Sequence, residues 1–453
     1  MATTRYVQHL NVEKADRMDF ERMRHAWLAV ILVLALSACG ESDEERRTAY
    51  TFGLVMVGPY NDQGWSQANY DAGNYVVSKL PGTRMVYIDK ANSSDRPGTT
   101  PAQLAEQLVA QGAKLIIFSS DDMKESANDF ALTHPDIYVI MTSGDQVWRA
   151  GHAYNAIPNM VNIMGRMEYM KMVGGCAAAM TTQTGKIGYL GPLINDETRR
   201  LAASAYLGAK YCWTQYLSRE AAALSFDVTW IGFWFNIPGV TLDPTQVADD
   251  FFSSGHDVVF SGIDTREALS EAKKMHDAGQ STWAIPYDYV GACDKAPAVC
   301  LGVPYFNWGP AYLATIQTAI DGTWTSNFQW NAADWRNINN PDTSAVGFLK
   351  GLALSSDASA GVDQLIGELA RGLVLWKGPL NLQDGTVYLT DGEAATDQQI
   401  WYLPQLLQGM EGESVTSNLL AVARYPAAAE RQGGWTVNRH SQEPPEGTNE
   451  TSQ

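Results

Sequence analysis

The architecture of the chain is visible first in the segment TFGLVMVGPYNDQGW, residues 51–65. Its first seven residues are apolar or β-branched, which is typical of a strand buried on both faces of a sheet. A short loop containing Gly, Pro, Asn and Asp follows, and an amphipathic helix is predicted from Trp65 to Leu80. A buried strand that passes through a short loop into a helix is the opening unit of a parallel α/β sheet.

The same unit repeats along the chain. Further strands are predicted at Arg84–Ile88, Lys114–Ser119 and Ile137–Met141, with helices at Pro101–Gln111 and Met123–His134. A helical, Met- and Ala-rich stretch at Asn159–Thr182 precedes a second series. Its predicted strands are Lys186–Leu190, Ser225–Trp230, Val258–Phe260 and Trp283–Pro286, and its helices are Glu197–Tyr216, Pro244–Ser254 and Thr265–Ala278. The sequence therefore predicts two doubly wound α/β lobes.

Beyond Leu301 the alternation weakens, and the later pieces are expected to cross back and complete both lobes. We place lobe 1 at residues 49–157, completed by about 305–325, and lobe 2 at 158–290, completed by about 355–410. Crossovers near 155–160, 290–305 and 325–355 would then form a hinge of several segments. Residues 427–453, rich in Pro, Glu, Ser, Asn and Gln, are predicted to be disordered.

The N-terminus has the pattern of a secretory signal. A basic run at Arg22–His25 is followed by the apolar run Ala26–Ala35, which is too short to span a bilayer, and then by Leu36-Ser37-Ala38-Cys39. This last tetrapeptide resembles the lipobox of bacterial lipoproteins, which implies a signal at residues 1–38 and lipidation of Cys39. The alternative is an ordinary signal peptide cleaved near Ala38. Residues 39–48 are polar and are predicted to form a flexible tether, so that the protein is extracytoplasmic and anchored to a bacterial membrane by lipid alone.

Composition excludes some classes of partner. The chain of 453 residues has 32 Lys and Arg against 50 Asp and Glu, which gives a net charge of −18. This negative charge disfavours binding to nucleic acid. Trp (14) outnumbers Phe (13), which suggests that some indoles face a ligand.

The cysteines beyond Cys39 indicate disulfides rather than metal binding. Cys293 and Cys300 lie in one loop and are predicted to form a disulfide, whereas spacing leaves the pairing of Cys176 and Cys212 open. No His lies at metal-ligand spacing from these cysteines, so no metal site is expected.

Ligands of doubly wound folds bind at the carboxyl ends of the strands. The loops predicted at that edge contain indoles that can stack on a ring and polar groups that can orient it. Asp62 and Asp264 could alternatively cap the helices that follow them. The candidate ligand-binding residues in these loops are Asp62, Trp65, Ser143, Trp234, Asp264 and Asp288.

Several of these segments carry a family resemblance. The loop Gly58–Gln67 looks like the Asp-x-x-Phe-Asn loop of the Bmp (basic membrane protein) family, and Trp230–Phe235 resembles a Trp-x-x-x-Trp-Tyr/Phe-Asp-Pro loop in one of its branches. Other segments are similar in family order between Thr51 and Gly409. They are Thr184–Gly191, Leu207–Lys210, Gly255–Val259, Asn307–Pro310, Asp321–Trp324, Lys377–Pro379 and Gln383–Gly385.

The resemblance implies a type I periplasmic-binding-protein-like fold and a role as the substrate-binding lipoprotein of an ABC importer for a purine base or nucleoside. Trp65 and Trp234 would stack on the base from the two lobes, and Asp264 and Asp288 would orient it. Trp308 would lie near the cleft, although a role in packing between the lobes is an equal alternative. The implied partner is an ABC permease, and the implied state is a monomer without a cofactor.

Two other functions are candidates: a nucleoside hydrolase and a tethered sensor. A nucleoside hydrolase would need an Asp cluster with a metal, or a general base beside a nucleophile, but Asp121-Asp122 has no nearby His. No Gly-x-Gly-x-x-Gly follows a strand and no Walker sequence occurs, so the sequence indicates a binding protein and not an enzyme. A tethered sensor that reports ligand to a membrane receptor would share the same fold and pocket, and the sequence leaves it open.

Overall fold

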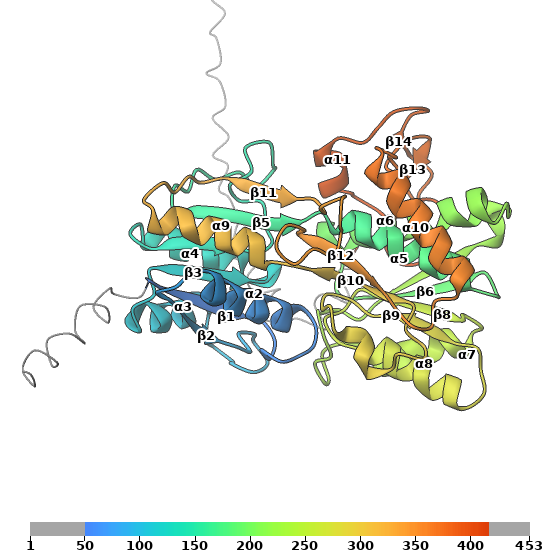
Figure 1. Cartoon of the computed structure of the whole chain (residues 1–453), viewed down its shortest axis with the longest axis horizontal. Coiled ribbons are helices and arrows are strands. Elements are labelled where there is room, and N and C mark those ends of the chain that lie inside the picture. The colour runs from blue at the N-terminus through green and yellow to red at the C-terminus, as the bar shows by residue number, and fades with distance from the viewer. Residues whose placement is uncertain (1–49, 416–453) are drawn as a thin grey trace, which may run out of the picture.

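The chain folds into two α/β lobes that lie side by side in Figure 1. The computed structural model describes residues 50–415, so the predicted signal (1–38), Cys39, the tether (39–48) and the tail (427–453) lie outside the described residues. Between residues 50 and 415, none of the helices combines the length and apolarity needed to cross a bilayer.

The first lobe is built on a six-stranded sheet in the order β11-β5-β4-β3-β1-β2, and every neighbouring pair in it is parallel. β1 lies between β3 and the edge strand β2 and is almost wholly buried, as its apolar sequence predicts. The strands are β1 (Tyr50–Met56), β2 (Thr83–Ile88), β3 (Leu115–Ser119), β4 (Tyr138–Met141), β5 (Met160–Gly165) and β11 (Phe328–Asn331). The helices are α2 (Trp65–Lys79), α3 (Pro101–Ala110), α4 (Lys124–Thr133) and α9 (Gly309–Ile320), with a 3-10 turn η1 at Asp121–Met123.

The second lobe repeats this design with a parallel four-stranded sheet in the order β7-β6-β8-β9. Its strands are β6 (Lys186–Gly191), β7 (Ser225–Trp230), β8 (Val258–Ser261) and β9 (Trp283–Ile285). Its helices are α5 (Met167–Thr181), α6 (Asp196–Tyr211), α7 (Pro244–Ser253), α8 (Glu267–Asp277) and α10 (Ser356–Ala370). Short turns η2 (Cys212–Tyr216), η3 (Ala221–Ala223) and η4 (Ala292–Lys295) complete it. In both lobes the second strand of the lobe lies outside its first, the order of a doubly wound fold with its crevice at the reversal point.

The chain passes between the lobes in several places. β10 (Gly302–Phe306) and β12 (Val346–Lys350) form a separate antiparallel ribbon, which runs across the middle of Figure 1. β5 pairs with β4 in the first sheet and therefore belongs to lobe 1. The predictions of a crossover at 155–160 and of a lobe 2 that starts at residue 158 are thus wrong. The prediction of helix across Met160–Gly165 failed because no turn residue separates this apolar strand from α5, and pairing on both sides by β4 and β11 fixes it as a strand.

Of the C-terminal elements, β13 (Leu380–Asn381) and β14 (Val387–Leu389) lie beside α10 of lobe 2, and α11 (Asp397–Trp401) lies closer to the junction of the lobes (Figure 1). Arg166, at the passage from β5 to α5, holds Asp397 through two hydrogen bonds of 3.0 and 2.8 Å. The ring of Tyr402 stacks on His152 in lobe 1, whereas the Leu403 carbonyl accepts a 2.7 Å hydrogen bond from Arg199 on α6. This segment therefore contacts both lobes.

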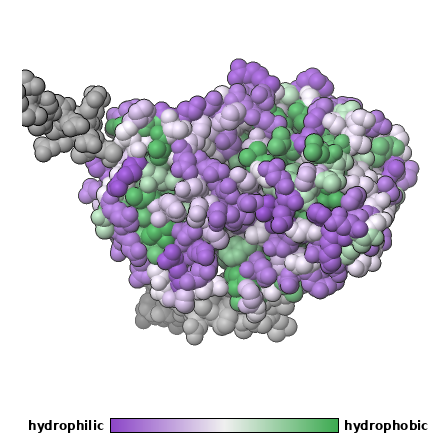
Figure 2. All heavy atoms as spheres, turned by 60° about the horizontal axis from the view of Figure 1, so that its bottom comes forward, coloured by the Kyte–Doolittle hydropathy of each residue, from purple (hydrophilic) through white to green (hydrophobic). Residues whose placement is uncertain are grey.

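The face of the molecule in Figure 2 is mostly hydrophilic, and its hydrophobic residues form small separate groups. Single apolar residues on a surface are usual in soluble domains, and a continuous apolar patch would instead mark a contact with another molecule.

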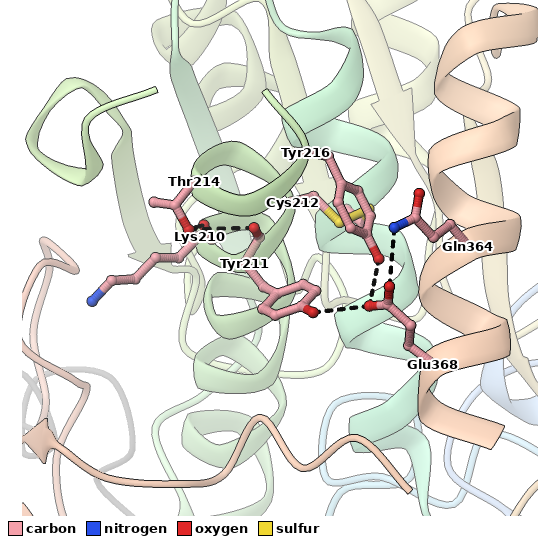
Figure 3. Close-up of a disulfide and its surroundings, with 8 residues drawn as sticks. Lys210, Tyr211, Cys212, Thr214, Tyr216, Gln364 and Glu368 are labelled. Carbon is pink, nitrogen blue, oxygen red and sulfur yellow. Dashed lines mark hydrogen bonds between the residues drawn. A yellow bond between two sulfur atoms is a disulfide. The ribbon is translucent and has the colours of Figure 1, made fainter. Parts of the chain in front are cut away.

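Helices α5 and α6 pack backbone to backbone. A Cβ atom added to Gly175 would lie 1.9 Å from the Ala205 carbonyl oxygen, so only glycine permits this approach. A disulfide between Cys176 and Cys212 joins the two segments, and a second one joins Cys293 and Cys300. Next to the first, Tyr211 and Tyr216 both donate hydrogen bonds to Glu368 on α10, as Figure 3 shows, so that three helical segments are tied together.

Removing the Cys176–Cys212 disulfide by a double alanine substitution should lower the free energy of unfolding by about 3–4 kcal/mol, since the chain-entropy cost of an open loop rises with loop length. This disulfide closes a separation of 36 residues, whereas Cys293–Cys300 closes only 7. The matched double alanine variant of the second pair should therefore lose less, about 2 kcal/mol. Urea unfolding of both variants measures the order, and a larger loss from the shorter loop would contradict it.

Candidate ligand-binding site

A cavity lies between the two lobes at the carboxyl ends of their strands, with about 420 Å³ of space free of protein atoms, part of it open to solvent. The loops that line it begin directly after β3, β6, β7, β8 and β9, where the fold leaves backbone and side chains free to converge. Lobe 1 and lobe 2 both contribute walls. The lining residues are Trp65, Ser120, Asp121, Tyr189, Pro192, Glu197, Thr198, Leu201, Trp234, Gly262, Asp264 and Tyr287.

Trp65 is the aromatic residue that lobe 1 contributes to the cavity wall, and it is the first residue of α2. The Asp62 carboxylate accepts hydrogen bonds from the backbone N–H groups of Gly64, Ser66 and Gln67 at 2.8, 3.0 and 2.9 Å. Asp62 thus caps α2, the alternative that the sequence left open, and it does not line the cavity. The Trp65 indole N–H donates to the Ser119 carbonyl at 2.5 Å, which fixes the ring against β3.

Trp308 lies behind Trp65 and not on the cavity surface. Its ring meets Trp65 edge to face with centroids 5.2 Å apart and stacks on Phe306 at 4.5 Å. Only 2% of Trp308 is exposed. Trp308 therefore has the packing role that the sequence left as an alternative to ligand contact. It contributes to the site by supporting the Trp65 ring.

Trp234 is the lobe 2 aromatic wall, in the loop that follows β7. Its carbonyl accepts a 2.9 Å hydrogen bond from the Asp264 N–H, which joins the loop after β7 to the loop after β8. The Trp234 indole N–H is buried and has no hydrogen-bond partner within residues 50–415. A buried donor without a partner costs about 1–3 kcal/mol, so this N–H is available to a ligand acceptor.

Of the two carboxyl groups predicted to orient a ligand, Asp264 lines the cavity and Asp288 does not. Burial raises the pKa of the Asp264 carboxyl well above its usual range, with the nearby charges of Asp288, Asp62 and Glu197 raising it further. Asp288 is fully buried, and neither of its carboxylate oxygens accepts a hydrogen bond from the described part of the chain. Burial also raises the pKa of Asp288, and the charge of Lys171 opposes that rise. Asp264 is therefore the one of these two carboxyl groups that is placed to hydrogen-bond a ligand in the cavity.

Lys171 was not predicted from the sequence. It lies on α5 with no exposed surface, and its Nζ donates to the Ser261 carbonyl at 3.0 Å. The Nζ also lies 3.2 Å from the centre of the Tyr287 ring that lines the cavity. Burial lowers the pKa of Lys171 well below its usual value. The available signal was one charged residue within the otherwise uncharged run Met170–Ala179, which is a rare position for lysine.

Ser143 and Glu197 connect the lobes. The Ser143 hydroxyl, after β4, donates a 2.8 Å hydrogen bond to Glu197 at the start of α6. Of these two residues, Glu197 lines the cavity and Ser143 does not. Ser143 was predicted to contact the ligand, but in this structure it contacts the other lobe instead. Burial raises the pKa of Glu197 to about 7, with the Arg200 charge opposing the rise. Sequence reasoning missed Glu197 because an acidic residue in the first turn of a helix is ordinarily explained by the helix dipole.

The raised pKa of Glu197 predicts a pH-dependent stability. The folded protein holds the proton to a higher pH than the unfolded chain, so the contribution of Glu197 is present below about pH 4.5 and is lost as pH rises through about 7. The loss is roughly 3 kcal/mol for a shift of this size. Glu197→Gln keeps a hydrogen-bond acceptor for Ser143 but cannot ionise. Urea unfolding from pH 4 to 8 should show the variant gaining stability relative to the wild type as pH rises, and a constant difference would contradict this assignment.

The two lobes also touch directly around the cavity. A Cβ atom on Gly64 would lie 1.7 Å from the Asp264 carbonyl oxygen, so the start of α2 meets the loop after β8 backbone to backbone. The Gln67 amide donates to the Tyr289 hydroxyl at 3.0 Å, and the Asn195 amide donates to Asp121 at 3.2 Å. The structure is therefore a closed arrangement of the two lobes, with the cavity between them.

Residues 49–348 match the Bmp family, described as ABC transporter substrate-binding protein, PnrA-like. The chain belongs to the Bmp family. The Bmp protein described here is thus an extracytoplasmic ABC transporter substrate-binding protein by family, a class that binds substrates without converting them. Within residues 50–415, no three His, Cys, Asp or Glu side chains gather in a way that could hold a metal ion.

Two curated relatives are similar to this Bmp chain. A purine-binding protein of Brucella abortus is 25% identical over 374 residues, which cover 82% of this chain and 95% of the relative. A protein of Haloferax volcanii, named for an ABC transporter glucose-binding role, is 24% identical over 286 residues, 62% of this chain and 63% of its own length.

Solved structures agree on the fold. An ABC transporter solute-binding protein of Conexibacter woesei superposes with a TM-score of 0.53 at 17% identity, covering 72% of this chain and 97% of that one. A solute-binding protein of Aeropyrum pernix gives 0.57 at 12% identity, with 74% and 93% covered. The type I periplasmic-binding-protein-like α/β fold expected from the sequence is confirmed.

Proposed function

We propose that this Bmp protein captures a purine base or nucleoside in the cavity between its lobes and delivers it to an ABC permease, while a lipid on Cys39 holds it at the membrane. The observation that carries the proposal is a cavity with a tryptophan wall from each lobe, in which the buried indole N–H of Trp234 has no partner within the described residues.

The two indoles suit a flat, aromatic ligand. Trp65 is fixed by its hydrogen bond to Ser119 and by the rings behind it, so its face is presented without loss of side-chain freedom on binding. Stacking of a base on an aromatic side chain contributes about 1–3 kcal/mol in single-strand recognition, and the same interaction is available here.

The polar groups suit the edge of a purine. Its ring nitrogens and any keto oxygen accept hydrogen bonds, which the Trp234 indole N–H can donate. Its N–H groups, and the hydroxyls of a ribose, donate hydrogen bonds, which Asp264 and Glu197 can accept at the cavity wall. The Trp234 N–H is buried and has no partner within residues 50–415, so a ligand without an acceptor would leave it unpaired.

Hinge closure provides the mechanism. A ligand that touches Trp65 in one lobe and Trp234 in the other stabilises the closed arrangement over the open one, because only the closed arrangement offers both contacts. The permease would then recognise the closed form. The family description and the purine-binding relative from Brucella abortus support this proposal.

Glucose is the second candidate, because the Haloferax volcanii relative is named for it. Isothermal titration calorimetry of the purified protein with adenosine, guanosine, hypoxanthine and glucose separates the two. The proposal expects at least one purine to bind at least about 100-fold more tightly than glucose, a difference of about 2.7 kcal/mol. Glucose binding with no response to any purine would overturn it.

A further inference from the structure

Tyr287 lines the cavity but was not among the residues predicted from the sequence. It comes two residues after the end of β9, at the carboxyl edge of the second sheet, where ligands of this fold bind. Only 6% of Tyr287 is exposed, and its hydroxyl is buried without a hydrogen-bond partner within residues 50–415. A buried tyrosine usually finds a partner for its hydroxyl, so this hydroxyl is available to a molecule in the cavity.

Two neighbours hold the Tyr287 ring in place. The Nζ of Lys171 lies 3.2 Å from the centre of the ring, and the same ammonium group donates to the Ser261 carbonyl at 3.0 Å. The ring of Phe306 lies at a tilt with its centroid 6.0 Å away, and Phe306 also meets Trp65 edge to face at 5.2 Å. Tyr287 of lobe 2 and Trp65 of lobe 1 therefore pack against one shared ring. Because the Tyr287 ring is already fixed, its hydroxyl can bind a ligand with little loss of side-chain freedom.

The Tyr287 hydroxyl is a hydrogen-bond donor. Burial raises the pKa of Tyr287 well above its usual value, and the negative charges of Asp288 and Glu197 raise it further, so the hydroxyl keeps its hydrogen. The hydroxyl lies near enough to Asp288 to lower the pKa of that carboxyl, yet no hydrogen bond of ordinary length and angle joins the two groups. Asp288 does not line the cavity, so the hydroxyl can take as its partner an acceptor that enters the cavity.

A purine base offers the acceptor that this hydroxyl lacks. Its ring nitrogens and keto oxygens accept hydrogen bonds at its edges, while its faces are free to stack on Trp65. A molecule that fills the cavity also excludes water from the hydroxyl. A ligand without an acceptor at this point would leave the hydroxyl unpaired and would bind less tightly for that reason.

We propose, on the basis of the proposed function, that Tyr287 is a further specificity-determining residue, whose hydroxyl donates a hydrogen bond to one acceptor of the bound base. Tyr287 thereby selects purines that carry this acceptor over bases of the same shape that lack it. One hydrogen bond of this kind changes affinity by roughly two- to tenfold, and an unpaired hydroxyl adds to the difference.

The test compares hypoxanthine with three analogues that each lack one acceptor. They are purine, without the 6-keto oxygen, 3-deazahypoxanthine, without N3, and 7-deazahypoxanthine, without N7. Each is used as the free base or as the riboside, according to which form of hypoxanthine binds more tightly. Calorimetry should show that the wild type binds one of the three at least about fivefold more weakly than hypoxanthine because the partner of Tyr287 is missing from it.

Tyr287→Phe keeps the ring and removes the hydroxyl. It should weaken hypoxanthine binding at least about fivefold, whereas its affinity for the analogue that lacks the acceptor should stay within about twofold of the wild type. The other two analogues should lose about as much affinity as hypoxanthine does. Thermal unfolding should show no loss of stability, because the hydroxyl has no partner in the described part of the chain.

Tyr50→Phe is the matched control. Tyr50 is the first residue of β1 and does not line the cavity, and its hydroxyl is also buried without a partner among the described residues. This variant should bind all four probes like the wild type.

The outcomes separate the two proposals. A change of less than about twofold for hypoxanthine in Tyr287→Phe, or an equal loss for all four probes, would overturn the role of Tyr287 while leaving purine binding intact. A loss of stability in Tyr287→Phe would show that the hydroxyl is bound within the protein, and it would overturn that role too. Absence of binding of any purine to the wild type would instead overturn the proposed function.

Discussion

Replacing Gly64 by alanine is expected to weaken ligand binding by at least about 100-fold, or about 2.7 kcal/mol, without unfolding either lobe. The added Cβ would lie 1.7 Å from the Asp264 carbonyl oxygen, which belongs to the other lobe. Gly64 has φ −143°, outside the left-handed region that favours glycine, and the closest atom to its added Cβ belongs to the other lobe. The substitution therefore opposes closure, and a lobe pair that cannot close offers the ligand only one tryptophan wall.

Gly367→Ala is the matched control, because this glycine lies in α10 and the nearest atom to its added Cβ is the flexible tip of Arg371, 3.2 Å away. Calorimetry gives the affinities, and small-angle scattering with saturating ligand reports closure. Gly64→Ala should remain as extended with ligand as without it. A variant that binds and closes like the wild type would show that the described lobe contact is not required for binding.

Trp234→Ala is expected to weaken purine affinity at least about tenfold, since stacking on one aromatic side chain contributes about 1–3 kcal/mol. Trp234→Phe separates the contribution of stacking from that of the hydrogen bond. It keeps a stacking ring and removes the indole N–H that lacks a partner in the described chain. The phenylalanine variant should lose about two- to tenfold, as expected for one hydrogen bond.

Trp324→Ala serves as the control for Trp234, because Trp324 stacks on Tyr138 in lobe 1 and does not line the cavity. Trp65→Ala should match Trp234→Ala in affinity, and it should also lower stability because its ring supports Phe306 and Trp308. Thermal unfolding of each variant confirms that the loss of binding is measured on folded protein. Unchanged affinity in both Trp65→Ala and Trp234→Ala would refute the aromatic walls.

Much of the fold could be predicted because each strand and helix of the two lobes has a recognisable pattern in its own local sequence. The strand and helix of TFGLVMVGPYNDQGW differ in hydrophobic period and are separated by a Gly- and Pro-containing loop, and the structure has them at Tyr50–Met56 and Trp65–Lys79. The strands β10 and β12 were not predicted, since each is short and their pairing is antiparallel across a separation of about forty residues along the chain.

The candidate site was predictable where a residue follows a strand at the crevice edge, and less so where its role depends on burial. Trp65, Trp234 and Asp264 line the cavity, as their positions in the sequence suggested. Lys171 and Glu197 come from helices, and only the packing of α5 and α6 against the crevice brings them to it. Asp62 shows the converse, because a loop carboxylate that precedes a helix can serve as its cap, and here it does.

The central claim is that the closed lobes hold a purine between Trp65 and Trp234. The most direct test is mass spectrometry of the small molecule released when the protein, purified without added ligand, is denatured. A purine base or nucleoside is expected at close to one molecule per chain, and it should be absent from a Gly64→Ala preparation made in parallel. A sugar or an amino acid in that position would contradict the claim, although the two-lobed fold would stand.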